Sequence, residues 1–274
     1  MRYANKNWAG LMVGASLLAG CQLDALTREE AQDSLDESSV DSQASALTAA
    51  SVEISTDFTI GEAAERAADK IRMFVKSQLP CAEITLADAT LTIEYGALPG
   101  SCTYRGHRFS GLHEIQVERN MDSDVIVHHR WDALSNGRIS VSGEATVTWT
   151  KADPSRRIEH ELTWTRLEDG RTGTGSGDRI QKPLAGGIAE GISVDGVRAW
   201  DGKRGHWDLD INDIEMRWTD PVPQSGSWVL VTPKDKTITL EFERIDEDSI
   251  AVTASGGERN IDLKIDKLGA ITRR

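Results

Sequence analysis

The feature that most constrains this chain is an alternation of apolar and polar residues that recurs from Cys81 to the C-terminus. Residues 238–242, 250–254 and 261–265 show it most clearly. Successive side chains of a β-strand point to opposite faces of the sheet, so this period of two is typical of strands with one buried face. We therefore predict an all-β, mainly antiparallel protein, a meander of about a dozen strands that forms either an open curved sheet or a barrel.

Dipeptides that favour sharp turns separate these segments. Such pairs tolerate the positive φ angles that two-residue hairpins require. They occur at Asn136-Gly137, Asp169-Gly170, Asp201-Gly202, Asn212-Asp213 and Gly256-Gly257. Three of the turns predict a register in which the large or apolar side chains of paired strands coincide. The predicted pairs are Val252 with Ile261 and Ile250 with Leu263 about Gly256-Gly257, Trp207 with Trp218 and Leu209 with Met216 about Asn212-Asp213, and Trp164 with Gly175 and Leu162 with Gly177 about Asp169-Gly170.

One segment has the periodicity of a helix. Apolar residues recur at helical spacing through residues 60–79, and charged residues occupy the opposite face. Residues 59–62 match a capping box, and Pro80 ends the pattern. We predict an amphipathic helix that packs on or across the sheet.

Residues 1–20 have the organisation of a secretory signal peptide. Arg2 and Lys6 precede an uncharged stretch, residues 8–20, which is too short to cross a bilayer as a helix. The stretch ends in Leu18-Ala19-Gly20-Cys21, which resembles the bacterial lipobox. This resemblance implies cleavage before Cys21, acylation of that cysteine and lasting membrane attachment. Gln22, and not Asp, follows the cysteine, which implies the outer membrane, with the protein facing the periplasm or the cell surface.

The segment after the lipobox is rich in Ser, Ala, Asp, Glu and Gln, and it has few large apolar side chains. Such a composition buries too little surface to offset the entropy of ordering. We predict that residues 21–57 consist of the lipidated Cys21 and a flexible acidic tether. Residues 58–274 are then a single β-rich domain with its N-terminal helix.

Two cysteines remain in the mature chain, Cys81 and Cys102. An exported protein reaches a compartment where disulfides persist, so we predict that the two pair. The formal net charge is −13 at pH 7. An acidic chain without a basic stripe argues against nucleic acid and against anionic head groups as partners.

The sequence contains three patterns that superficially suggest chemistry. His128, His129 and His160 suit a metal or a hydrolase, but adjacent strand residues point to opposite faces. Residues 208–213 lack the glycine and glutamate of a calcium loop, which leaves a hairpin tip. Residues 170–177 are glycine-rich but precede no helix, so we predict a glycine-bearing strand packed under tryptophans. We predict no metal and no cofactor, and we do not favour an enzyme.

Tryptophan is the unusual side chain of this sequence. Tryptophans fill sheet cores or cover glycines, and an exposed row can stack on sugars or enclose an apolar ligand. For the second case, Trp200, Trp207 and Trp218 are the candidate ligand contacts.

Three functional hypotheses follow. The chain resembles the large class of bacterial lipoproteins with β-rich soluble domains, which implies a non-catalytic envelope protein that is structural or binds a glycan, a lipid or an envelope protein. The second hypothesis is a carrier or chaperone of lipid or lipoprotein, similar in architecture to the curved half-barrels under a helix that serve lipoprotein sorting. It requires an apolar cavity under the helix. The third is a hydrolase that uses His128 or His160.

Overall fold

The structure is a computed structural model, and the description below is limited to part of the chain. The described residues are 37, 40–41, 43–53, 64–87, 90–104, 107–119, 124–150, 155–217, 220, 222–256, 259–267 and 271–273. The lipobox and the predicted capping box lie outside these residues.

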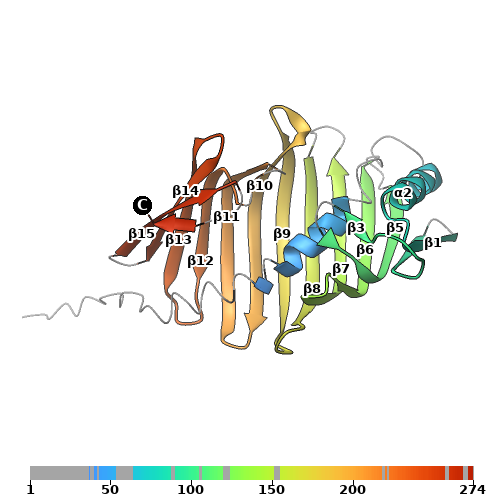
Figure 1. Cartoon of the computed structure of the whole chain (residues 1–274), viewed down its shortest axis with the longest axis horizontal. Helices are drawn as coiled ribbons and strands as arrows, with labels where there is room; N and C mark the ends of the chain where they lie inside the picture. The colour runs from blue at the N-terminus through green and yellow to red at the C-terminus, as the bar shows by residue number, and fades with distance from the viewer. Residues whose placement is uncertain are drawn as a thin grey trace, which may run out of the picture.

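Fourteen strands form one antiparallel sheet whose strand order follows the chain, with the two short strands β3 and β4 left out (Figure 1). The strands are β1 (Ala82–Ala87), β2 (Thr90–Tyr95), β5 (Ser110–Arg119), β6 (Val125–Ser135), β7 (Ile139–Thr150), β8 (Ser155–Arg166), β9 (Thr172–Leu184), β10 (Gly187–Gly202), β11 (Gly205–Arg217), β12 (Ser225–Val231), β13 (Thr237–Asp246), β14 (Ser249–Gly256), β15 (Arg259–Asp266) and β16 (Ile271–Arg273). A separate short hairpin consists of β3 (Thr103–Tyr104) and β4 (His107–Arg108). The predicted mainly β meander is confirmed.

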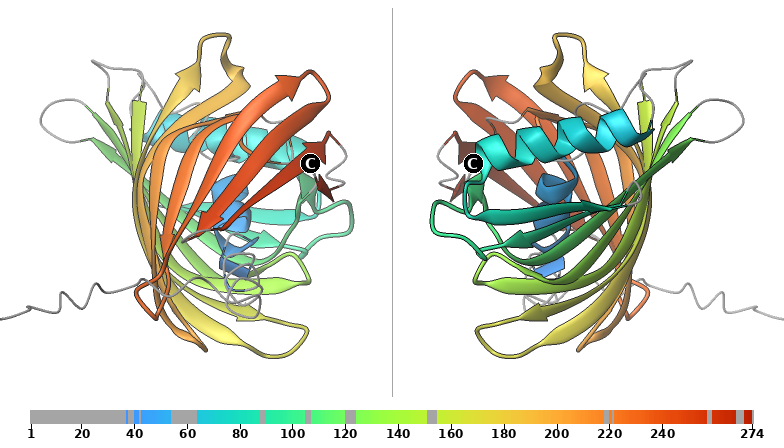
Figure 2. Two further views of the ribbon diagram at one scale, coloured as in Figure 1. Left: turned by 90° about the vertical axis from the view of Figure 1, so that its left-hand side faces the viewer. Right: turned by 90° about the vertical axis from the view of Figure 1, so that its right-hand side faces the viewer.

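The sheet is open and strongly curved, so it has a concave and a convex face (Figure 2). Strands β1 and β16 are the two edges of the sheet, and they do not pair with each other. Of the two predicted shapes, the protein therefore adopts the open curved sheet. Both described helical segments lie on its concave side.

Helix α2 (Ala64–Gln78) crosses the sheet at its N-terminal end. It contacts β1, β2 and β5. Its buried side chains recur at helical spacing: Ala68, Ile71 and Val75 are fully buried, as is Leu79 just beyond its end. The helix predicted over residues 60–79 is therefore confirmed over its described part. The disulfide between Cys81 and Cys102 is also confirmed, and it fixes the end of α2 to the segment that leads into β3.

The second helical segment was not expected. Residues 43–53, with residues 37, 40 and 41, are helical, and we call them the buried helix. The segment lies inside the curve of the sheet (Figure 2), where Val40 is 1% exposed and Leu47 is fully buried. A flexible tether was predicted here because the segment has few large apolar residues. That reasoning failed because alanines and small hydroxyl side chains of the segment are buried and its carboxylates pair with buried arginines, although few of its side chains are large.

The apolar core has two parts. The first lies between the concave face of β1, β2 and β5–β8 and the two helices. The second lies on the concave face of β10–β15, and we call it the C-terminal apolar cluster. Its members are Ile192, Val194, Trp200, Trp207, Leu209, Ile211, Ile214, Leu230, Phe242, Ile250, Val252 and Ile265.

Most of the predicted turns lie at or beside a real turn, but the predicted strand registers are shifted. Asn136 and Gly137 form the β6–β7 turn, and Asp169 and Gly170 lie in the β8–β9 turn. The latter loop is longer than two residues, so Trp164 pairs with Gly173 and not with Gly175. About the β14–β15 turn, Val252 pairs with Leu263 and Ala254 with Ile261. Each error is a shift of two residues, which keeps the same faces buried.

The hairpin predicted at Asn212-Asp213 is wrong. Both residues lie inside β11, where the pairing with β10 and β12 shifts register, and Asp213 has a φ of 48°. Asn and Asp tolerate this conformation in a bulge as well as in a turn. The chain reverses instead at Lys203 and Arg204, directly after the predicted Asp201-Gly202, and Trp207 pairs with Trp200.

Candidate binding face

Three buried ion pairs join the buried helix to the sheet. Each one links a carboxylate of the helical segment to an arginine on or beside β8–β10: Glu37 with Arg171, Asp41 with Arg198, and Glu53 with Arg156. None of the six side chains is more than 7% exposed. A buried charge is costly unless it is paired, so these three contacts fix both the position and the direction of the helix.

Strand β9 makes room for this helix because its concave-facing residues include glycines. The indole of Trp164 covers Gly173, and the side chain of Asp41 lies 3.2 Å from the point that a Cβ on Gly175 would occupy. The prediction of a glycine-bearing strand under a tryptophan is thus confirmed. The same glycines leave space for the carboxylate that Arg198 binds.

A fourth arginine on this face, Arg179 of β9, has no carboxylate partner among the described residues. Its Nε is buried and makes no hydrogen bond there. Burial lowers the pKa of Arg179 to about 10, so the guanidinium stays charged at neutral pH. We call Arg156, Arg171, Arg179 and Arg198 the basic strip.

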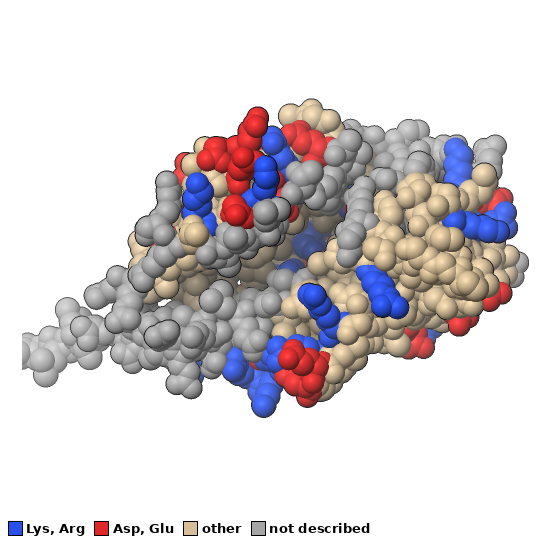
Figure 3. All heavy atoms as spheres, in the orientation of Figure 1, with Lys and Arg blue, Asp and Glu red and all other residues tan. Residues whose placement is uncertain are grey.

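Arg179 lies where the basic strip meets the C-terminal apolar cluster. Its neighbour on β10 is Gly196, which has no side chain, and the residue beyond Gly196 on β11 is Ile211 of that cluster. Figure 3, which looks onto the concave side, shows a hollow with Lys or Arg atoms at its base. The cation of Arg179, the position without a side chain at Gly196 and the apolar side chain of Ile211 thus lie next to one another.

Buried histidines occupy the neighbouring strands. The hydroxyl of Tyr95 is 3.1 Å from Nδ1 of His113, and Nε2 of His113 is 2.9 Å from Nδ1 of His129. If Tyr95 donates to His113 and His113 to His129, the remaining donor is Nε2 of His129, which has no partner among the described atoms. Nδ1 of His160 is buried and likewise unpartnered there.

These histidines are neutral at physiological pH. Burial lowers the pKa of His129 to about 3, and the nearby His128 adds to the effect. Burial also lowers the pKa of His160 to about 3, with a further contribution from the charge of Arg179. The pKa of His113 lies well below its usual value for the same reason, with a contribution from His129. The rings are therefore core groups, and the fixed positive charge of this face comes from the arginines.

The predicted tryptophan contacts lie in the core. Trp200 and Trp207 are cross-strand partners whose rings stack 6.0 Å apart, and each is 2% exposed. Trp218 lies outside the described residues. Trp131 and Trp164 are equally buried. These indoles fill the concave face and offer little open surface on which a sugar could stack.

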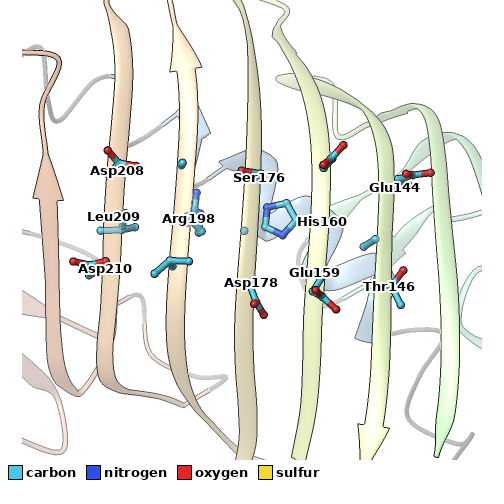
Figure 4. Close-up of a pocket in the computed structure, with 15 residues that line it drawn as sticks. Glu144, Thr146, Glu159, His160, Ser176, Asp178, Arg198, Asp208, Leu209 and Asp210 are labelled. Atoms are coloured by element: carbon cyan, nitrogen blue, oxygen red, sulfur yellow. The ribbon is translucent and has the colours of Figure 1, made fainter.

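The convex face has the opposite charge. Figure 4 looks at the middle of the sheet from this side, with the buried helix behind it. A shallow hollow is lined here by carboxylates, among them Glu144, Glu159, Asp208 and Asp210. Among the described residues no group of three His, Cys, Asp or Glu has the arrangement of a metal site. Residues 208–213, predicted as a hairpin tip, lie within β11.

The two histidines of the hydrolase hypothesis are on opposite faces. His128 lies on the convex face, where its ring contacts Glu118 and Thr146. His160 lies on the concave face, opposite Gly177 of β9. Adjacent residues His128 and His129 also face opposite sides, as the alternation predicts.

Comparison with known proteins gives no relative. No protein-family model matches the chain, and no curated protein or solved structure matches it. Within the described part of the chain, no helix combines the length and the apolar character needed to cross a membrane.

Sequence reasoning missed the basic strip and its carboxylate partners. A weak signal was present, because Arg156 and Arg198 occupy inward positions of their alternating strands, in phase with Ile158 and Trp200. A second signal was the spacing of Glu37 and Asp41, which places both on one side of a helix. Both signals are weak, because arginine and glutamate usually lie on the surface.

Proposed function

We propose that this protein is a non-catalytic envelope lipoprotein, anchored through acyl chains on Cys21, which binds an amphiphile with an anionic head group on its concave face. The observation that carries the proposal is Arg179, a concave-face cation without a carboxylate partner among the described residues. Arg179 is partly exposed, with its Nε buried. A partly buried cation without a counter-charge is unfavourable, and an anionic ligand removes that penalty.

The neighbourhood of Arg179 supports a ligand with an apolar part. Gly196 leaves the position beside it without a side chain, and Ile211 and Val194 of the C-terminal apolar cluster border that position. A head group bound by Arg179 would leave its tail along these residues. Charge-assisted hydrogen bonds would hold the head group, and apolar burial would hold the tail.

A carrier with its cavity under α2 is the alternative. Its support is weaker, because the side chains beneath this helix are closely packed. Ile71, Val75 and Leu91 are fully buried, and Leu47 of the buried helix, also fully buried, belongs to the same cluster. A lipid would have to use the C-terminal half of the concave face, which is the site proposed above. The hydrolase hypothesis has no support from the placement of His128 and His160 on opposite faces.

The test compares two amphiphiles with the same tail and opposite charge. The unacylated mature chain with Cys21→Ser is titrated with dodecyl phosphate and with dodecyltrimethylammonium below their micelle concentrations, and binding is followed by calorimetry. We expect dodecyl phosphate to bind more tightly. Arg179→Gln is expected to weaken that binding by about 10-fold or more, the effect of losing a hydrogen bond to a charged group.

Arg157→Gln is the matched control. Arg157 lies on the convex side of β8, half exposed, and pairs with Asp178 and Glu159. The control is expected to bind dodecyl phosphate like the parent protein. Equal affinity for the two amphiphiles, no binding of dodecyl phosphate, or an Arg179→Gln variant with unchanged affinity would each overturn the proposal. Near-ultraviolet circular dichroism checks that every variant is folded.

A further inference from the structure

A single row of uncharged residues leads away from Arg179 across the C-terminal half of the sheet. Each member is the cross-strand partner of the one before it, so all of them lie on the concave face. From β10 to β15 the row consists of Gly196, Ile211, Trp228, Leu240, Ala254 and Ile261. Gly196 is in turn the partner of Arg179 on β9. We call these six residues the apolar row.

The apolar row is the accessible part of this half of the concave face. Trp228, Leu240 and Ala254 are half-buried. The residues two positions along the same strands are more deeply buried: Leu230 is 6% exposed and Phe242 is 7% exposed. In Figure 3, which keeps the orientation of Figure 1, the hollow over β11 and β12 is lined by tan atoms, which belong to residues other than Lys, Arg, Asp and Glu. A ligand that enters this hollow would therefore contact the apolar row.

The length of the apolar row limits the ligand that it can cover. Adjacent strands are about 4.8 Å apart, so the row runs about 19 Å from Gly196 on β10 to Ala254 on β14. A staggered hydrocarbon chain advances about 1.25 Å per carbon, because C–C bonds of about 1.5 Å meet at tetrahedral angles. The row therefore covers at most about 15 carbons, and fewer where curvature shortens the path over the concave side. Beyond it, Ile261 is 42% exposed and lies outside the part of β15 that pairs with β16, so the row ends in solvent.

We infer that the apolar row binds one unbranched alkyl chain, of at most about 15 carbons, whose anionic head group lies at Arg179. The inference rests on the proposed function for the head group, and it adds the class of the tail. Same-face residues of one strand are about 7 Å apart, which is room for one alkyl chain and not for two side by side. The ligand class is thus a single-chain anionic amphiphile.

The first experiment measures how affinity depends on chain length. Octyl, decyl, dodecyl, tetradecyl and hexadecyl phosphate are titrated into the mature chain with Cys21→Ser, each below its micelle concentration, and binding is followed by tryptophan fluorescence. We expect affinity to rise about fourfold per added methylene while the chain still lies on the row, and to level off before hexadecyl phosphate. A branched isomer of hexadecyl phosphate, whose carbons form two arms, is expected to bind about tenfold more weakly than the straight isomer, because several methylenes stay in water.

A larger side chain near the end of the row is expected to shorten it. Ala254→Phe occupies the position on β14, and since one strand spans about four carbons, affinity should level off at a chain about two to four carbons shorter. Thr253→Phe is the matched control. Thr253 precedes Ala254 on the same strand, and its side chain lies on the convex side, where its hydroxyl bonds Asp262. This control is expected to keep the length dependence of the parent protein.

A second measurement locates the tail without enlarging any side chain. Dodecyl phosphate that is brominated at the middle of its chain would place a heavy-atom quencher over Trp228, two strands from Gly196. Trp228→Phe is expected to remove most of the quenching that the ligand causes. Trp149→Phe is the control, because Trp149 is also half-buried but lies on β7 in the N-terminal half of the sheet. It is expected to leave the quenching unchanged.

The possible outcomes separate this inference from the proposed function. Four results would overturn the inference and leave Arg179 as the head-group site: affinity that is independent of chain length or rises by the full increment through hexadecyl phosphate, a branched isomer that binds as tightly as the straight one, an unchanged length limit in Ala254→Phe, or quenching that persists in Trp228→Phe. If no alkyl phosphate binds, the proposed function fails and this inference fails with it. Should Ala254→Phe not fold, the quenching measurement decides.

Discussion

The indole Nε1 of Trp131 donates a hydrogen bond of 2.9 Å to the hydroxyl oxygen of Ser51, which lies 80 residues earlier in the chain. Trp131 is in the middle of β6, and Ser51 is in the buried helix. Trp131 is 2% exposed and Ser51 is fully buried. The bond therefore makes the N-terminal segment part of the core and not an appendage to it.

Removal of this hydroxyl is expected to destabilise the protein. Ser51→Ala leaves the indole N–H of Trp131 buried without its acceptor, which costs about 1–3 kcal/mol. The free energy of unfolding is measured in urea by tryptophan fluorescence. Ser77→Ala is the matched control, because the hydroxyl of Ser77 is exposed and bonds the carbonyl of Phe74 in its own helix. If both variants lose equal stability, the buried helix does not contribute as described.

The ion pair between Asp41 and Arg198 gives a second prediction. Asp41→Asn leaves the guanidinium of Arg198 buried without its counter-charge, and we expect a loss of about 3 kcal/mol or more in urea. Addition of Arg198→Met removes that charge and is expected to recover part of the loss. The control is Asp248→Asn, whose partner Lys267 is exposed, and no measurable change is expected. A double variant less stable than Asp41→Asn would contradict the pairing.

The buried histidines predict a dependence of stability on pH. The pKa values of His129 and His160 are lowered to about 3 in the folded protein, whereas the unfolded chain binds protons near pH 6.5. Stability is therefore full above about pH 6.5 and falls as the pH drops toward 3. Between these values each histidine contributes a slope of at most about 1.4 kcal/mol per pH unit.

The measurement is the urea midpoint between pH 6.5 and 5, above the range where most carboxylates titrate. His160→Gln is expected to reduce the slope. His206→Gln is the control: Asp201 and Asp208 raise the pKa of the exposed His206, so that residue stabilises the protein at low pH and loses this effect as the pH rises. The control variant His206→Gln is therefore still expected to lose stability as the pH falls from 6.5 to 5. If the urea midpoint of His160→Gln depends on pH as steeply as that of the parent protein, the prediction is wrong.

Packing over the glycines of β9 gives a fourth prediction. A methyl group at Gly173 would overlap the six-membered ring of the Trp164 indole and, less closely, the backbone carbonyl oxygen of Asp201. Gly173→Ala is expected to cost about 1–3 kcal/mol, the usual effect of overpacking a core. Trp164→Phe in the Gly173→Ala background removes the overlap with the indole, though not that with Asp201, and the double change is expected to cost less than the two single changes combined. Thr174→Ala, on the exposed face of the same strand, is the control, and additive losses would contradict the contact.

The sequence alone determined the local features of this protein. Alternation identified the strands, and it correctly placed His128 and His129 on opposite faces. Helical spacing found α2, and the export signal led to the pairing of Cys81 with Cys102. These inferences succeeded because each depends on a period or a chemistry that neighbouring residues express without reference to the rest of the chain. The registers about Asp169-Gly170 and Gly256-Gly257 failed by two residues because a turn dipeptide does not fix the length of its loop. The hairpin at Asn212-Asp213 failed because these residues suit a bulge as well as a turn.

Only the tertiary structure decided where the charges lie. Composition predicted a tether at residues 21–57 and an acidic surface without a basic patch. The fold pairs Glu37, Asp41 and Glu53 with arginines more than a hundred residues away. Propensity and periodicity act between residues close in sequence, whereas ion pairs depend on distance in space and on exclusion of water. Those two quantities do not exist until the sheet has curved and the helix has packed inside it.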